Sequence, residues 1–137
     1  MLIEERARYA VQLASLIEEG SDIIYVDETT FNTHLRAKRT YMYPDCPVNI
    51  EISNRRLSGV TLFGAIGSCL QRPVFMTGRS TNSLEFREFL LKMIEQLPAG
   101  MPKPYLVHDG ARAHYSNISR DLIDTHFHRL ALPPYSC

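Results

Sequence analysis

The chain has 137 residues, of which 15 are basic and 15 are acidic, so its formal net charge at pH 7 is zero. That length predicts one domain with a sizeable core, and the balanced charge gives no sign of a polyanionic partner spread over the whole surface. A nucleic-acid site would therefore be a local patch. We expect no membrane partner, because no apolar run approaches the roughly 20 residues of a membrane span, and the charged start MLIEERARYA does not read as a signal peptide.

Helical and strand patterns alternate along the first part of the chain. Residues 2–19 carry apolar side chains at helical spacing, and Gly20 supplies the end of this leading helix. Residues 22–26 form a short run rich in β-branched and aromatic side chains, which predicts a buried strand. Two further strands are predicted over 57–66 and 73–77, joined by a turn.

The second part continues the alternation. Asn82, followed three residues later by Glu85, resembles a capping box in front of a helical stripe that runs from Phe86 to Leu97. The remaining predicted elements are a strand over 105–107, a helix over 116–125 and a strand over 127–132. Three strands, then a helix, a strand, a helix and a strand imply an α/β fold in which a mixed central sheet is flanked by helices. Ribonuclease H-like domains have this order.

Two aspartates follow apolar runs that read as strands: Asp27 in IIYVDET and Asp109 in YLVHDGARAH. Strand ends converge in such sheets, so we expect the two side chains to become neighbours. Carboxylates suit Mg²⁺, and two such ions about 4 Å apart can activate an attacking oxygen and stabilise a leaving one. The alternative for each aspartate taken singly, a turn former or helix cap, is the commoner role.

The words VDETTFN, FGAI, LVHDGARAH and LPPYS closely resemble, in the same order, the catalytic domain of mariner-type transposases in the DDE superfamily. The resemblance covers about Asp22 to Cys137. It implies a single partial catalytic domain over 1–137, with a leading helix over 1–20 and a ribonuclease H-like core over 21–137. It also implies that Asp27 and Asp109 are catalytic residues that bind Mg²⁺ or Mn²⁺.

The chain departs from the family pattern at several points. In the family, LPPYS leads to a third acidic residue, which would lie beyond Cys137, so we expect the chain as given to lack strand cleavage. Gly110 stands where the family commonly has Asn, and Tyr41 or Tyr43 takes the place of a frequent Trp. The family's helix-turn-helix modules do not fit into residues 1–20.

Five accessory residues need an interpretation, and two of them, Glu28 and His114, have two each. Glu28 is either a spare metal ligand or an ordinary exposed acid, and we favour the second. His114 matches a family histidine that could orient a catalytic carboxylate or contact substrate, and its alternative is a polar residue near a helix start. His108 should face away from Asp109 and be buried or hydrogen-bonded. His126 and His128 are expected to be solvated residues of an edge strand.

Basic residues gather in the polar segment after the first strand. They either contact DNA phosphates or form a solvated charged face. The candidate DNA-binding residues are Arg36, Lys38, Arg39, Arg55 and Arg56. The three cysteines, Cys46, Cys69 and Cys137, are widely spaced without a CxxC pair, which predicts reduced thiols.

The resemblance implies the core of a DNA transposase that performs metal-dependent strand cleavage and strand transfer on double-stranded DNA, acting as a homodimer on paired transposon ends. The alternative is a degenerate or domesticated module that binds DNA or another partner without catalysis. The third hypothesis is a different ribonuclease H-like nuclease, and the LPPYS motif argues against it. We expect a nuclear location for a eukaryotic element and a cytoplasmic one otherwise.

Overall fold

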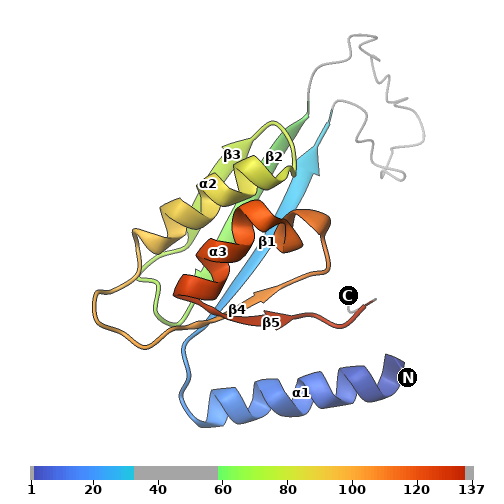
Figure 1. The fold of residues 1–137 in the computed structure, drawn as a ribbon, viewed down its shortest axis with the longest axis vertical. Coiled ribbons are helices and arrows are strands. Elements are labelled where there is room, and N and C mark those ends of the chain that lie inside the picture. The colour runs from blue at the N-terminus through green and yellow to red at the C-terminus, as the bar shows by residue number, and fades with distance from the viewer. Residues whose placement is uncertain (1, 33–58, 135–137) are drawn as a thin grey trace, which may run out of the picture.

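The computed structural model describes residues 2–32 and 59–134, which build a five-stranded mixed sheet with helices on both faces (Figure 1). In sheet order the strands are β3 (Val74–Gly78), β2 (Val60–Gly67), β1 (Ile23–Phe31), β4 (Tyr105–His108) and β5 (His128–Ala131). The pairs β1–β2 and β2–β3 are antiparallel, and β1–β4 and β4–β5 are parallel. The helices are α1 (Leu2–Glu18), α2 (Ser83–Ile94), α3 (Asn117–His126) and a short 3-10 helix, η1 (Arg112–Tyr115). The predicted fold class and element order are confirmed.

Local sequence signals set the helix ends. Gly20 adopts a φ of 72°, and the amides of Gly20 and Ser21 donate to the carbonyls of Ile17 and Leu16. This hydrogen-bond pattern is the Schellman motif, which ends α1 where the glycine predicted.

The start of α2 follows the predicted cap only in part. Asn82 accepts a hydrogen bond from the Glu85 amide at 2.9 Å, as a cap should. The Glu85 carboxylate, however, accepts from the amides of Arg79 and Ser80, at 3.0 and 2.8 Å, instead of reaching back to Asn82. The cap therefore fixes both the first turn of α2 and the loop that enters it.

The two faces of the sheet are covered differently. Helices α2 and α3 lie side by side on one face and enclose the main core (Figure 1). On the other face Leu16 of α1 packs against Ile23, Val107 and Leu130. Strand β4 is thus buried on both sides, since its Leu106 belongs to the main core.

The first strand is longer than predicted, which moves Asp27 away from a strand end. The sequence indicated a strand over 22–26, but β1 continues to Phe31 because its antiparallel pairing with β2 extends to Phe31 opposite Val60. The expectation that Asp27 ends a strand is therefore wrong. Asp109 does follow directly after β4, as expected.

The other strands and helices shift by a few residues at most from their predicted limits, and η1 was not predicted. Cys69 is a free thiol, as expected, whereas Cys46 and Cys137 lie outside the described residues. Within the described part of the chain, no helix has both the length and the apolar character that a membrane crossing requires.

Candidate metal centre

The register of the parallel strands brings the two predicted aspartates to the same level. Tyr25 of β1 pairs with Val107 of β4, and Asp27 and Asp109 each come two residues later. Residues two apart in a strand point to the same face, so Asp27 shares the face of Tyr25, opposite α2 and α3. Each aspartate therefore lies two residues beyond the last pair between β1 and β4, although Asp27 itself still pairs with Gly64 of β2.

Asp27 is exposed, and among the described residues its carboxylate has a single hydrogen-bond donor. Its Oδ1 accepts a hydrogen bond from the amide of Glu28 at 2.8 Å. Among the described residues no donor contacts its Oδ2. The position of this carboxylate thus depends on the backbone of β1, which the ladder with β2 fixes on both sides of the residue.

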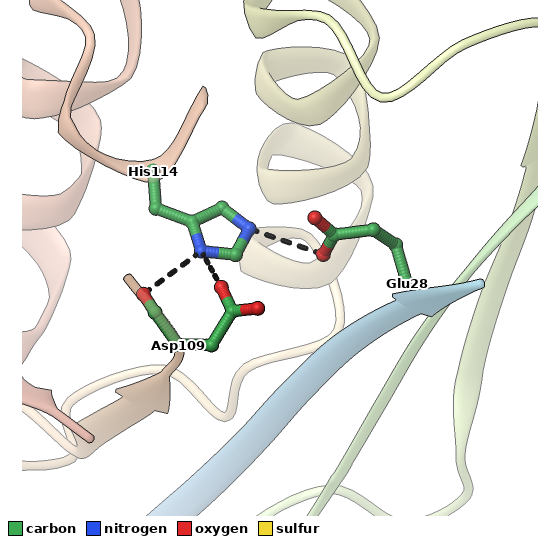
Figure 2. Close-up of side chains that lie close together, drawn as sticks. All are labelled: Glu28, Asp109 and His114. Atoms are coloured by element: carbon green, nitrogen blue, oxygen red, sulfur yellow. Dashed lines mark hydrogen bonds and ion pairs between the residues drawn. The ribbon is translucent and has the colours of Figure 1, made fainter. Parts of the chain in front are cut away.

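Asp109 belongs to a cluster with His114 and Glu28 (Figure 2). The ring of His114 is fully buried; its Nδ1 lies 2.8 Å from Oδ1 of Asp109, and its Nε2 lies 3.1 Å from Oε2 of Glu28. The same Oδ1 of Asp109 accepts from the Ala111 amide at 3.0 Å. Of the two readings of His114, the structure supports the one in which it orients the carboxylate of Asp109.

Glu28 is not the ordinary exposed acid that we favoured from the sequence. Its side chain is only 9% exposed, because the even-numbered positions of β1 face α2 and α3, where Ile24 and Val26 are also buried. Glu28 and Asp27 therefore point to opposite faces of the sheet. The expectation of an exposed side chain at Glu28 is wrong.

The geometry fixes the charge of His114. Both ring nitrogens face carboxylate oxygens, which only accept, so both nitrogens must carry protons. Burial lowers the pKa of His114, but the hydrogen bond and charge of Glu28 and the contacts with Asp109 outweigh it and leave the pKa raised.

The same protonation excludes His114 as a metal ligand in this arrangement. Potential ligand atoms of Glu28, Asp109 and His114 lie within 4.8 Å of one another, which is a spacing that a metal ion could use. A histidine binds a metal through a nitrogen lone pair, however, and an imidazolium has none. The cluster is therefore an ion-pair bridge from β1 to Asp109.

His108 is buried and hydrogen-bonded, which confirms the prediction for it. Its Nδ1 lies 2.7 Å from the carbonyl oxygen of Asp109, and its Nε2 lies 3.1 Å from Nη1 of Arg129. Arginine can only donate, so Nε2 accepts and the proton resides on Nδ1, which gives a neutral ring. Burial, the largest cause, lowers the pKa of His108 and favours this neutral form.

Sequence reasoning missed Arg129, although one signal was available. It is a basic residue in the otherwise apolar run RLAL of the last strand. Its Nη1 also donates to the carbonyl of His114 at 2.8 Å, and its guanidinium lies 4.9 Å from the centre of the Tyr115 ring.

The remaining predicted residues fall in three places. His128 is exposed at the start of the edge strand β5, as expected, whereas His126 ends α3 instead of lying in a strand. A Cβ atom at Gly110 would meet no atom within 4 Å, so the family's Asn would fit here and its replacement reflects no steric need. The basic candidates Arg36, Lys38, Arg39, Arg55 and Arg56 lie outside the described residues.

The two aspartates fit a hard divalent ion by their chemistry. Protein donors hold Oδ1 of each carboxylate, and among residues 2–32 and 59–134 none contacts either Oδ2. Asp109 is 50% exposed at its side chain and Asp27 is exposed, so water can reach both. Mg²⁺ typically uses one or two carboxylates and keeps several waters, so each of these carboxylates is by its chemistry a suitable ligand.

Comparisons with known proteins give a family and a fold. The family model for the DDE superfamily endonuclease matches residues 22–137. The Mos1 strand transfer complex is 19% identical with a TM-score of 0.69 over 98% of this chain and 43% of that chain. The Mos1 mariner paired end complex with Mn is 20% identical with a TM-score of 0.67, covering 98% and 44%. The catalytic domain of Mos1 mariner transposase is 13% identical with a TM-score of 0.63, covering 98% and 62%.

These structural matches confirm the predicted ribonuclease H-like fold and its likeness to a mariner transposase catalytic domain. The chain spans less than half the length of the first two of these structures. No protein of curated function matches it significantly. The match covers residues 22–137, which include both aspartates, and it shows the family: the chain belongs to the DDE superfamily endonucleases.

Proposed function

We propose that this chain is part of the catalytic core of a mariner-type DNA transposase. The whole transposase would cleave DNA strands and transfer them with the help of divalent metal ions, whereas we expect the chain as given to lack strand cleavage. The observation that carries the proposal is the pairing of β1 with β4, which brings the aspartates of the two family motifs level on adjacent strands. Related folds occur in a strand transfer complex and in a paired end complex with Mn, which supports double-stranded DNA as the partner. We extend the proposal to a homodimer on paired ends.

In this proposal Asp27 and Asp109 hold Mg²⁺ or Mn²⁺. When bound, the metal would act as a Lewis acid that activates the attacking oxygen and stabilises the leaving one. The chain's own residues prepare that site. The β1–β2 ladder fixes the backbone at Asp27, and His114 and the Ala111 amide fix Oδ1 of Asp109, so within the described part of the chain no donor occupies Oδ2 of either carboxylate.

The test is Mn²⁺ binding, measured by the loss of the free-ion electron paramagnetic resonance signal. We expect Asp27→Asn and Asp109→Asn each to weaken binding by about tenfold or more, because each removes one anionic ligand. Asp121→Asn is the matched control, since Asp121 is an exposed aspartate of α3, and it should bind Mn²⁺ like the original chain.

A second outcome would favour the other hypothesis. If Mn²⁺ binding ignores both substitutions while the chain still binds a double-stranded oligonucleotide, the assignment of the metal site is wrong. The chain would then act as a DNA-binding module without catalysis.

A further inference from the structure

We propose that Arg129 and Glu28 are positioning residues for Asp109, acting through His108 on its main chain and through His114 on its carboxylate. The inference rests on the proposed function, because it assumes that Asp109 binds a metal ion. Neither residue touches that ion in the proposal. Each holds a histidine that in turn holds Asp109.

The contacts that hold the main chain of Asp109 start at Arg129 on β5. One nitrogen of Arg129, Nη1, donates to Nε2 of His108 at 3.1 Å and to the carbonyl of His114 at 2.8 Å. His108 then donates from Nδ1 to the carbonyl of Asp109 at 2.7 Å. Because Arg129 contacts residues on both sides of the turn after β4, it fixes the two ends of that turn relative to β5.

The carboxylate side starts at β1. Oε2 of Glu28 accepts from Nε2 of His114, and Nδ1 on the opposite edge of the same ring lies 2.8 Å from Oδ1 of Asp109 (Figure 2). The ring of Phe86 packs on His114 with 4.3 Å between centroids, which restricts rotation of the imidazole. The contacts on both edges of the ring therefore hold a defined orientation of the Asp109 carboxylate.

Both sets of contacts act on Asp109, and among the described residues they leave Oδ2 of its carboxylate without a donor. The carbonyl of Asp109 accepts from His108 at 2.7 Å and lies 3.3 Å from Nδ1 of His114, its Oδ1 faces His114 and the Ala111 amide, and Oδ2 has no donor among the described residues. Ordering a ligand before the ion arrives removes an entropic cost from binding. Residues that hold metal ligands in this way typically affect metal affinity by about 10–100-fold when mutated.

The position of Asp109 beyond the β1–β4 pairing explains why side-chain contacts are needed to hold it. The pairing of β1 with β4 ends at Tyr25 and Val107, so no ladder to β1 fixes the backbone at Asp109. Asp27 lies within the β1–β2 ladder and needs none. Side chains from β1 and β5 supply at Asp109 the restraint that a neighbouring strand supplies at Asp27.

The first experiment measures Mn²⁺ affinity of Glu28→Gln and Arg129→Met. Gln keeps the size of Glu28 and an acceptor for His114 but removes the charge, and Met keeps much of the apolar length of Arg129 without its donors. We expect each to weaken Mn²⁺ binding by about tenfold. The matched controls are Glu88→Gln on α2 and Arg120→Met on α3, two exposed residues whose substitution should leave the affinity within about twofold.

The second experiment separates positioning from packing by the ¹⁵N chemical shifts of the His108 ring. The original chain should show a neutral ring with the proton on Nδ1, because Arg129 donates to Nε2. In Arg129→Met the ring should keep its proton on Nδ1, because the carbonyl of Asp109 accepts it, but the ¹⁵N resonance of Nε2 should move toward that of an unbonded ring nitrogen. A role of Arg129 in packing alone would leave the Nε2 resonance unchanged. If Arg129→Met does not fold, Arg129→Leu, which likewise has no donor, takes its place with the same expected direction in both measurements.

Asp109→Asn distinguishes the two ways in which the inference could fail. If Asp109→Asn leaves Mn²⁺ affinity unchanged, the proposed function fails at this residue. If Asp109→Asn weakens binding but folded Glu28→Gln and Arg129 variants bind like the original chain, the metal site stands and the positioning role is overturned.

Discussion

Asp27 and Asp109 occupy equivalent levels of neighbouring strands but are held in different ways. Asp27 is an exposed residue inside a regular strand, and among the described residues its carboxylate takes one hydrogen bond, from the next amide along the chain. Asp109 follows the end of β4 and contacts two buried histidines. Sheet register can therefore set where a carboxylate lies. For a residue beyond the end of a strand, the orientation of the carboxylate depends on side chains from other strands.

The largest effect should come from breaking the carboxylate side of the network at His114. His114→Ala leaves the carboxylate of Glu28, only 9% exposed, without its cationic partner. Removing one partner of a buried ion pair costs about 3–5 kcal/mol, so we expect the free energy of unfolding in urea to fall by that amount.

Two further variants test the cause of this loss. Glu28→Ala added to His114→Ala should recover part of the lost stability, because the unpaired charge disappears. His128→Ala replaces an exposed histidine of β5 and should cost less than about 1 kcal/mol. Equal losses for His114→Ala and His128→Ala would contradict the assigned bridge.

Substituting either aspartate should change the free energy of unfolding by a smaller amount. The two changes compare directly how firmly each aspartate is held. Without metal, Asp109→Asn should lower the free energy of unfolding by about 1 kcal/mol, because it removes the charge that faces His114 at a half-exposed position. Asp27→Asn should change it by less than about 0.5 kcal/mol, since the residue is exposed and faces no charged partner among the described residues. Thermal unfolding of both variants would show the order, and a larger loss for Asp27→Asn would reverse our account.

The smallest effect should come from pH, which changes protonation without leaving a cavity. The pKa of His108 lies below its ordinary value of 6.5, chiefly through burial. Below pH 6.5 the unfolded chain therefore binds the proton first, and stability falls as pH decreases. Burial also lowers the pKa of His114, but Glu28 and Asp109 hold it above 6.5 overall. Its contribution is complete below pH 6.5 and is lost as pH rises through the folded pKa.

Urea unfolding at a series of pH values should therefore give a maximum in stability near pH 6.5 from these two histidines. His114→Gln should remove the decline on the high-pH side and leave the decline on the low-pH side. A variant that lost both slopes would show that the two histidines do not titrate independently.

The sequence by itself determined the order of the strands and helices and most of their limits. Gly20 predicted the end of α1 because glycine tolerates the positive φ that the structure has there, and Asn82 predicted the start of α2. These signals are local, so a single segment carries them. The words around Asp27 and Asp109 likewise indicated the family that the match over residues 22–137 shows.

Only the tertiary structure decided which side chains surround Asp109. Ile23, Ile24 and Val26 are all apolar, so the sequence of β1 shows no alternation that would reveal the buried face to which Glu28 belongs. Its partner His114 is 86 residues away, and Arg129 reaches the same site from another strand. Contacts between distant segments leave no mark in local periodicity, because they arise only when the sheet brings β1, β4 and β5 together.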